Sequence, residues 1–173
     1  MIYSDKHRFV YLAPLKTGTS TLWDFLRKQY AAKLHNGNKH CFVIPESVID
    51  YFTFLTVRNP YLRILSLYND FKNYPWKIDM EVTMANVIRT AAPISNLIQG
   101  LRVDAVVHTE NLDEDFGRLP FLKEQPKLPK TNRSVPFVKG FAREHQVAVY
   151  ESQKADFEAF QYPTECPVPV FET

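Results

Sequence analysis

A short polar stretch between an apolar run and a patterned segment constrains this chain more than any other feature. The run Phe9–Ala13 is continuous and apolar, and the stretch Pro14–Thr21 after it reads Pro-Leu-Lys-Thr-Gly-Thr-Ser-Thr. Apolar residues then recur at helical spacing, at Leu22, Phe25, Leu26 and Tyr30. This order predicts a buried strand over Arg8–Ala13, a tight loop, and an amphipathic helix over Ser20–Leu34.

A loop between a strand and a helix is suited to anions, because backbone N–H groups and the positive end of the helix dipole converge there. Lys16 adds a cation, and Gly18 lets the backbone approach a ligand closely. The stretch is not the nucleotide loop G-x-x-x-x-G-K-[ST], since Lys16 precedes its only glycine. Four hydroxyl side chains add hydrogen-bond donors: Thr17, Thr19, Ser20 and Thr21.

Two further runs predict strands that lie parallel to the first. Tyr51–Val57 is dense in aromatic and β-branched residues, and Asp104–His108 forms a shorter apolar run. Helical patterns separate the runs, one of them opened by Asn59 as N-cap and Pro60 as first helical residue. Strands that alternate with helices predict an α/β architecture with a parallel sheet flanked by helices. Ligands bind beyond the carboxyl ends of such strands.

The remaining helices are predicted from apolar spacing and from helix-capping residues. We expect a short helix after Pro45, and longer helices over Met80–Ala92 and Glu151–Phe160. Pro93 ends the first of these longer helices, and Asn111 caps another helix that carries three acidic residues in its first turns.

A second anion site is predicted where the Tyr51–Val57 strand ends. Arg58 leaves that strand, and Ser66 lies on the helix that follows. A guanidinium matches the geometry of a phosphate, and a hydroxyl adds one more donor. Arg63 lies three residues before Ser66 on the same helical face, and either joins this site or pairs with an acid.

The two anion sites together resemble the motifs of sulfotransferases that use 3′-phosphoadenosine-5′-phosphosulfate (PAPS). Pro14–Leu22 resembles their 5′-phosphosulfate loop, and Val57–Tyr68 matches each named position of their 3′-phosphate motif, Val-Arg-[Asp/Asn]-Pro-x-x-Arg-x-x-Ser-x-Tyr. Later segments are similar to that family too, namely Asp104–Phe116, Asn132–Ser134 and Asp156–Tyr162. The chain looks closest to carbohydrate sulfotransferases of the chondroitin and HNK-1 type and to their short microbial relatives.

The resemblance implies one sulfotransferase domain over residues 1–173, with the three-layer, P-loop-NTPase-like fold of that family. It implies transfer of a sulfuryl group from PAPS, a co-substrate, to an acceptor hydroxyl of a carbohydrate or small alcohol, without a metal. Asn59 stands where that family commonly has Asp, and the chain is much shorter than the animal enzymes. Glycan specificity is therefore not carried over.

The resemblance also assigns roles to single residues. Arg58 and Ser66 would hold the 3′-phosphate, and Arg133 and Ser134 would close over the nucleotide. Lys16 would also help the phosphate leave. The 5′-phosphosulfate would bind to Lys16, Thr17, Gly18, Thr19, Ser20 and Thr21.

The general base that takes the acceptor proton is expected to be a histidine, since its pKa lies near neutrality. His40 is the first candidate, because it follows the first helix and precedes the second strand, where it can face the mouth of the site. His35 and Glu110 are the alternatives.

Two other functions stay open from the sequence. A non-catalytic module that binds an adenosine bisphosphate would keep Lys16, Arg58 and Ser66 but lack a usable base. An ATP-dependent phosphotransferase would need a Walker-type loop and a metal-binding acid at a strand end, and the sequence suggests neither.

The composition of the chain bears on its expected location in the cell and on its expected partners. The chain has 173 residues and a net charge of +2, which gives no argument for nucleic acid. No apolar run approaches the ~18 residues of a membrane span, and the N-terminus lacks the apolar core of a signal peptide. Cys41 and Cys166 are expected to be free thiols. We therefore expect a cytoplasmic protein whose partner is its acceptor substrate.

Overall fold

The structure is a computed structural model, and it describes residues 1–75, 81–122, 126–128, 136 and 138–171. The chain divides into two compact units: Met1–Arg58 with Gly100–Arg133, and Asn59–Gln99 with Ser134–Thr173. The single domain expected from the sequence stays a prediction.

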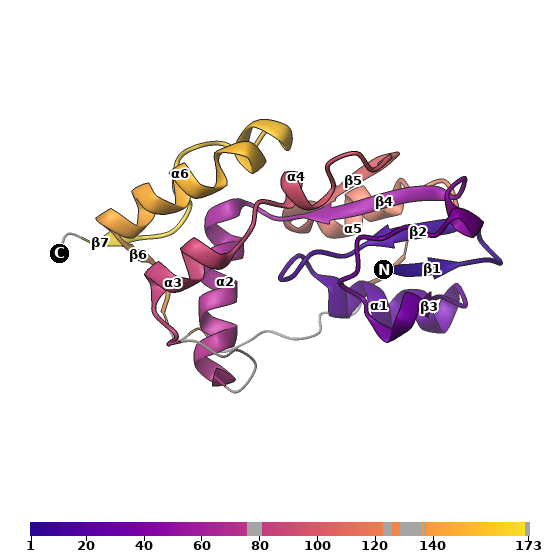
Figure 1. Ribbon diagram of the computed structural model, residues 1–173, viewed down its shortest axis with the longest axis horizontal. Helices are drawn as coiled ribbons and strands as arrows, with labels where there is room; N and C mark the ends of the chain where they lie inside the picture. The colour runs from indigo at the N-terminus through magenta and orange to yellow at the C-terminus, as the bar shows by residue number, and fades with distance from the viewer. Residues whose placement is uncertain (76–80, 123–125, 129–135, 137, 172–173) are drawn as a thin grey trace. The chain divides into compact units, whose positions relative to one another are not determined.

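The first unit is built on a mixed sheet of five strands in the order β3-β1-β2-β4-β5 (Figure 1). Parallel pairing joins β2 to β4 and β4 to β5, as the sequence predicts, with Tyr11 opposite Phe54 and Leu55 opposite Val106. The prediction of an α/β architecture with flanking helices is confirmed. The prediction of a wholly parallel sheet is wrong, because β1 runs antiparallel to both β2 and β3. The strands are β1 (Ile2–Ser4), β2 (Phe9–Leu12), β3 (Lys33–Leu34), β4 (Phe52–Val57) and β5 (Ala105–His108).

The first helix, α1 (Thr19–Gln29), is shorter than the predicted helix over Ser20–Leu34. It ends where Ala31 takes a left-handed backbone conformation with φ of 51°. Leu34 then pairs with Ile2 of β1. The backbone hydrogen bonds of this pairing take the place of those that the last residues of the predicted helix would have made.

One face of the sheet packs against α1 and α5 (Leu112–Gly117). Leu26 of α1 and Phe116 of α5 lie in one buried cluster with strand residues such as Tyr11 and Phe54. The rings of Tyr11 and Phe54 stack with centroids 4.7 Å apart. The described residues of this unit also form three short 3₁₀ helices: η1 (His35–Gly37), η2 (Glu46–Val48, the short helix expected after Pro45) and η4 (Thr109–Asn111).

The second unit packs helices around α2 (Pro60–Asn73) and α6 (Arg143–Ala159). Asn59 caps α2 as predicted, since its Oδ1 accepts the N–H of Tyr61 at 3.0 Å. The other elements are α3 (Met84–Thr90), α4 (Ile94–Leu97), β6 (Phe141–Ala142) and β7 (Val170–Phe171).

The predicted bounds of two helices in this unit are wrong. The last helix begins at Arg143, two turns before the predicted start at Glu151. Thr83 caps α3 by accepting the N–H of Asn86, so this helix starts later than the predicted Met80–Ala92. The break expected at Pro93 is present between α3 and α4.

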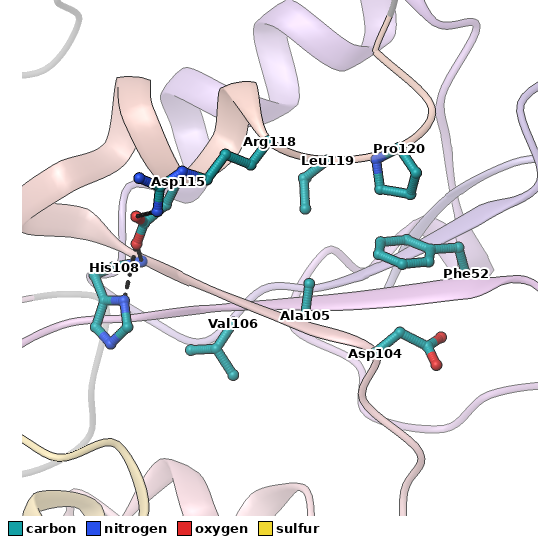
Figure 2. A pocket seen from close by; sticks show the side chains of 9 residues that line it. All are labelled: Phe52, Asp104, Ala105, Val106, His108, Asp115, Arg118, Leu119 and Pro120. Carbon is teal, nitrogen blue, oxygen red and sulfur yellow. Dashed lines mark hydrogen bonds and ion pairs between the residues drawn. The ribbon is translucent and has the colours of Figure 1, made fainter.

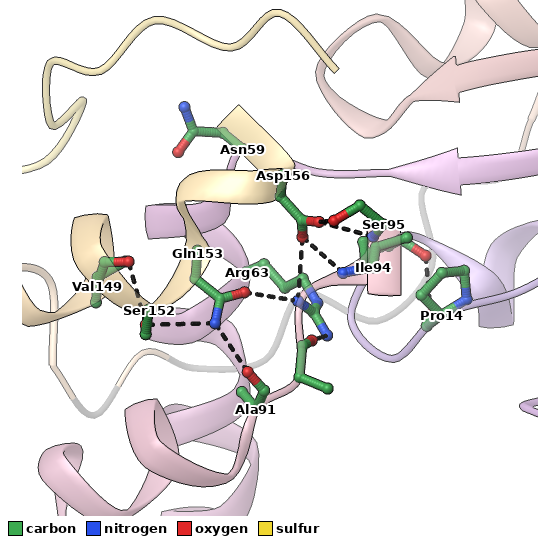
Figure 3. A network of polar contacts seen from close by, with 12 residues as sticks. Pro14, Asn59, Arg63, Ala91, Ile94, Ser95, Val149, Ser152, Gln153 and Asp156 are labelled. Atoms are coloured by element: carbon green, nitrogen blue, oxygen red, sulfur yellow. Dashed lines mark hydrogen bonds and ion pairs between the residues drawn. The ribbon is translucent and has the colours of Figure 1, made fainter. Parts of the chain in front are cut away.

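A buried polar network joins three helices of the second unit (Figure 3). Arg63 of α2 is buried with its Nη1 3.7 Å from Oδ2 of Asp156 and 3.2 Å from Oε1 of Gln153, both on α6. Asp156 also accepts the N–H groups of Ile94 and Ser95, each at 2.8 Å, at the start of α4. Arg63 therefore pairs with an acid, which was one of its two predicted roles.

None of the described helices is both long and apolar enough to span a membrane. Cys41 and Cys166 are free thiols, as expected.

We expect Asp156→Ala to lower the free energy of unfolding by about 3–5 kcal/mol, because it leaves the buried Arg63 without its counter-charge. Urea unfolding followed by circular dichroism measures this loss. Lys154→Ala is the matched control on the same helix, since its pair with Glu158 is exposed and should change the free energy by less than about 0.5 kcal/mol. Equal effects of the two variants would contradict the prediction.

Candidate functional site

Three strand ends meet at one edge of the first unit. Ala13 follows β2, Arg58 follows β4 and Thr109 follows β5. Because these strands are parallel neighbours, their carboxyl ends lie side by side. The hydroxyl of Thr109 donates to the carbonyl of Val57 at 2.6 Å, and Nη1 of Arg58 donates to the carbonyl of Lys16 at 3.3 Å. The 13–18 loop is thus tied to the neighbouring strand through Arg58.

Gly18 lies against the turn that follows β5. A Cβ placed on Gly18 would lie 3.6 Å from Leu112 and 3.8 Å from Thr109, which is ordinary contact. The turn with Glu110 therefore adjoins the loop with Lys16. Glu110 itself is exposed.

Buried hydroxyl groups hold the loop in shape. The Tyr11 hydroxyl lies 2.9 Å from Oγ1 of Thr56, which lies 2.7 Å from Oγ1 of Thr17. Thr17 and Thr19 both donate to the carbonyl of Pro14, at 2.8 and 3.0 Å. Burial raises the pKa of Tyr11 to about 12, so its hydroxyl keeps its proton. The hydroxyl groups of Thr17 and Thr19 are thus hydrogen-bonded within the protein and brace the loop. The predicted contacts of these two residues with a phosphosulfate would therefore be made by their backbone N–H groups.

The loop backbone opens the start of α1. Lys16 and Gly18 both have left-handed conformations, with φ of 66° and 79°. Within the described part of the chain, no side chain caps α1 by a hydrogen bond, and its first turn carries no acid. Ser20 and Thr21 lie half-buried in that turn. The N–H groups of the first turn, the Lys16 ammonium and the Arg58 guanidinium are the donors that an anionic group requires.

His40 is tied to the same loop. Its Nδ1 lies 2.7 Å from the carbonyl oxygen of Ala13, and since a carbonyl only accepts, Nδ1 carries the hydrogen. Nε2, the other ring nitrogen, has no hydrogen-bond partner among the residues that the structure describes. Burial lowers the pKa of His40, and the positive charges of Lys39 and the N-terminal amine lower it further, against the opposing bond to Ala13. The lowered pKa favours the neutral ring, which carries a lone pair on Nε2.

The other predicted residues have different surroundings. Nε2 of His35 lies 3.2 Å from the side-chain amide of Asn36, which occupies that nitrogen as a donor. Ser66 lies half-buried on α2 in the second unit, so its pairing with Arg58 stays a prediction. Arg133 and Ser134 lie outside the described residues.

A pocket of about 460 Å³ lies along β5 in the first unit (Figure 2). His108 and Asp104 lie at its two ends. Oδ2 of Asp115 accepts both the backbone N–H of His108 at 2.9 Å and its Nδ1–H at 2.8 Å, which ties β5 to α5. None of the predicted site residues that the structure describes lines this pocket. Its lining is Phe52, Asp104, Ala105, Val106, His108, Asp115, Arg118, Leu119 and Pro120.

Sequence reasoning missed four contributors to the loop site: Tyr11, the Ala13 carbonyl, Thr56 and Thr109. Thr109 was open to prediction, because it directly follows the third parallel strand. The hydroxyl chain from Tyr11 to Thr17 joins residues far apart in the sequence, and no local pattern marks it.

The described residues contain no group of three His, Cys, Asp or Glu side chains placed to hold a metal ion. Comparison of the chain with protein-family models, curated proteins and solved structures found no match. The resemblance to sulfotransferases therefore stays a prediction from the motifs.

We expect His40 to make stability depend on pH. Its folded-state pKa lies below the unfolded value near 6.5, so as pH falls through 6.5 the unfolded chain binds a proton first and the folded state loses stability. Urea unfolding at pH 7.5 and 5.5 tests this, with His40→Gln as the matched variant whose amide can still donate to Ala13. The wild type should lose more free energy than the variant over this interval, and equal losses would contradict the prediction.

Proposed function

We propose that this chain is a sulfotransferase that moves a sulfuryl group from PAPS to the hydroxyl of an acceptor. The observation that carries the proposal is the gathering of Lys16, Arg58 and His40 around the carboxyl ends of β2 and β4, within one compact unit. The proposal includes the P-loop-like sulfotransferase fold, of which the parallel strands β2, β4 and β5 and the loop between β2 and α1 are the supporting part.

The donor side of the site binds negative charge. Lys16 and the N–H groups at the start of α1 suit the 5′-phosphosulfate, since among the described residues the first turn of α1 carries no acid and no side chain caps the helix. Arg58 offers a guanidinium for the 3′-phosphate, with Ser66, Arg133 and Ser134 as the further contacts that the motifs suggest. The side chain of Lys16 leaves a backbone held in a left-handed conformation, which costs about 1 kcal/mol for a residue other than glycine.

The acceptor side needs a group that takes a proton. Nε2 of His40 would accept the proton of the acceptor hydroxyl while that oxygen forms a bond to sulfur. The bond between sulfur and the bridging oxygen of the 5′-phosphate breaks, and the electron pair stays on that oxygen. Lys16 and the α1 N-terminus would stabilise the charge that develops there. Glu110 adjoins the loop and remains the alternative base, whereas the amide of Asn36 occupies Nε2 of His35.

Calorimetric titration with adenosine 3′,5′-bisphosphate tests the donor site directly, with magnesium–ATP as the comparison ligand. We expect saturable binding of the bisphosphate and no binding of ATP. Arg58→Ala should weaken bisphosphate binding by about 1.5–3 kcal/mol, the range for a hydrogen bond to a charged group.

Arg27→Ala is the control for Arg58→Ala, because Arg27 is exposed in the last turn of the same unit's first helix. Its affinity should equal that of the wild type. Unchanged affinity in Arg58→Ala, or binding of ATP alone, would overturn the donor site.

Measuring turnover beside bisphosphate affinity distinguishes the proposed role of Lys16 in donor binding from that of His40 as the base. We expect Lys16→Ala to reduce turnover strongly, and His40→Ala to reduce it with little change in bisphosphate affinity. Release of adenosine 3′,5′-bisphosphate from PAPS in the presence of an acceptor measures both. Full turnover in His40→Ala would move the base to Glu110.

A further inference from the structure

Thr109 is the first residue after β5, and its hydroxyl reaches the end of β4. Oγ1 of Thr109 donates to the carbonyl oxygen of Val57 at 2.6 Å. Val57 and His108 are the last pair in the register of these two strands. The hydroxyl therefore adds one tie between β4 and β5 beyond their ladder, at the edge where Arg58 also leaves its strand.

The carbonyl that Thr109 holds belongs to the peptide unit that leads into Arg58. A peptide unit is planar, so a bond to the Val57 oxygen also sets the direction in which the backbone of Arg58 leaves β4. The other end of the Arg58 side chain is held as well, since its Nη1 donates to the carbonyl of Lys16 at 3.3 Å. Arg58 is thereby positioned both at its backbone and at its guanidinium.

A guanidinium that is positioned in advance binds an anion more tightly. An arginine side chain has several rotatable bonds, and ordering them on binding weakens affinity. The planar fork of Arg58 must also face a phosphate in one orientation to donate two parallel hydrogen bonds. A shift of the Arg58 backbone would lose that orientation although the charge stays in place.

The other branch of the Thr109 side chain lies beside the loop. A Cβ placed on Gly18 would lie 3.8 Å from Cγ2 of Thr109, so the methyl group faces the loop while the hydroxyl binds the end of β4. The two branches can be removed one at a time. Thr109→Val loses the hydroxyl and keeps a methyl group toward Gly18, whereas Thr109→Ser keeps the hydroxyl and loses the methyl group.

We propose that Thr109 is a positioning residue for the 3′-phosphate, because its hydroxyl orients Arg58 through the carbonyl of Val57. Thr109 contacts no ligand atom in this role and acts only through Arg58. The inference rests on the proposed function, since it adds a residue to the donor site of that reaction.

Calorimetric titration with adenosine 3′,5′-bisphosphate tests the role of the hydroxyl. We expect Thr109→Val to weaken bisphosphate binding about three- to tenfold, the range for the loss of one hydrogen bond. Thr109→Ser keeps that bond and should bind within about twofold of the wild type. Equal weakening by the two variants would assign the effect to the methyl contact with Gly18, and would overturn the proposal.

Thr53→Val is the matched control, because the hydroxyl of the buried Thr53 also donates to a backbone carbonyl, that of Tyr51 at 3.3 Å. Thr53 lies near the start of β4, whereas Arg58 follows the end of that strand. Urea unfolding measures the stability that each valine variant loses. The bisphosphate affinity of Thr53→Val should stay within about twofold of the wild type. Weakening that follows lost stability in both variants would show a structural role, and would contradict positioning.

A second background separates the orientation of Arg58 from its charge. Arg58→Lys keeps a cation but replaces the planar fork with a point charge on a flexible stem, which needs no fixed orientation. On that background, we expect Thr109→Val to weaken bisphosphate binding by less than about twofold, because coupled residues are not additive. The same loss as in the wild-type background would show that Thr109 acts without Arg58, and the proposal would fail.

The failure of the positioning role differs from the failure of the proposed function. Absence of bisphosphate binding in the wild type would overturn the proposed function and the role of Thr109 with it. Weaker binding in Arg58→Ala together with unchanged binding in Thr109→Val would overturn the role of Thr109 alone.

Discussion

The site depends on one chain of buried hydroxyl groups. Tyr11, Thr56 and Thr17 connect the two central parallel strands to the carbonyl of Pro14, where the loop begins. Thr17 gives its one hydrogen to Pro14, so Thr56 donates to Thr17 and Tyr11 donates to Thr56. The chain is satisfied only when β2 and β4 keep their register. The position of Lys16 therefore follows from strand pairing, and a rigid sheet rather than the loop itself sets where an anion would bind.

Charged side chains differ between the two units in their burial and in their hydrogen-bond partners. In the second unit, Arg63 and Asp156 are buried and pair with each other. Arg63 also donates to the carbonyl of Ala92, and Asp156 accepts a backbone N–H at the start of α4. In the first unit, Lys16 and Arg58 lie at the strand ends and are only partly buried. Although Arg58 and Arg63 are five residues apart on one motif, the environment assigns the second to stability. A motif match therefore does not give every one of its residues the same role.

Much of the fold was predictable because its signals are local. The strands Tyr51–Val57 and Asp104–His108, the Asn59 cap and the break at Pro93 follow from residue type and spacing. The antiparallel strands β1 and β3 were missed, because three and two residues carry no readable alternation and depend on pairing with distant partners. Of the candidate site, the sequence indicated the loop and His40, which the structure brings together. The bond from His40 to Ala13, which fixes the ring tautomer, joins residues 27 positions apart, and only the folded chain shows it.

The left-handed backbone at Lys16 sets stability against the proposed function at a single position. Glycine adopts that conformation without steric cost, so Lys16→Gly would relieve local strain while removing the cation. Selection for thermal stability alone would therefore favour a residue that the proposed donor site excludes. A library screened only for folded, heat-resistant variants would then enrich proteins that lack the proposed phosphosulfate contact of Lys16.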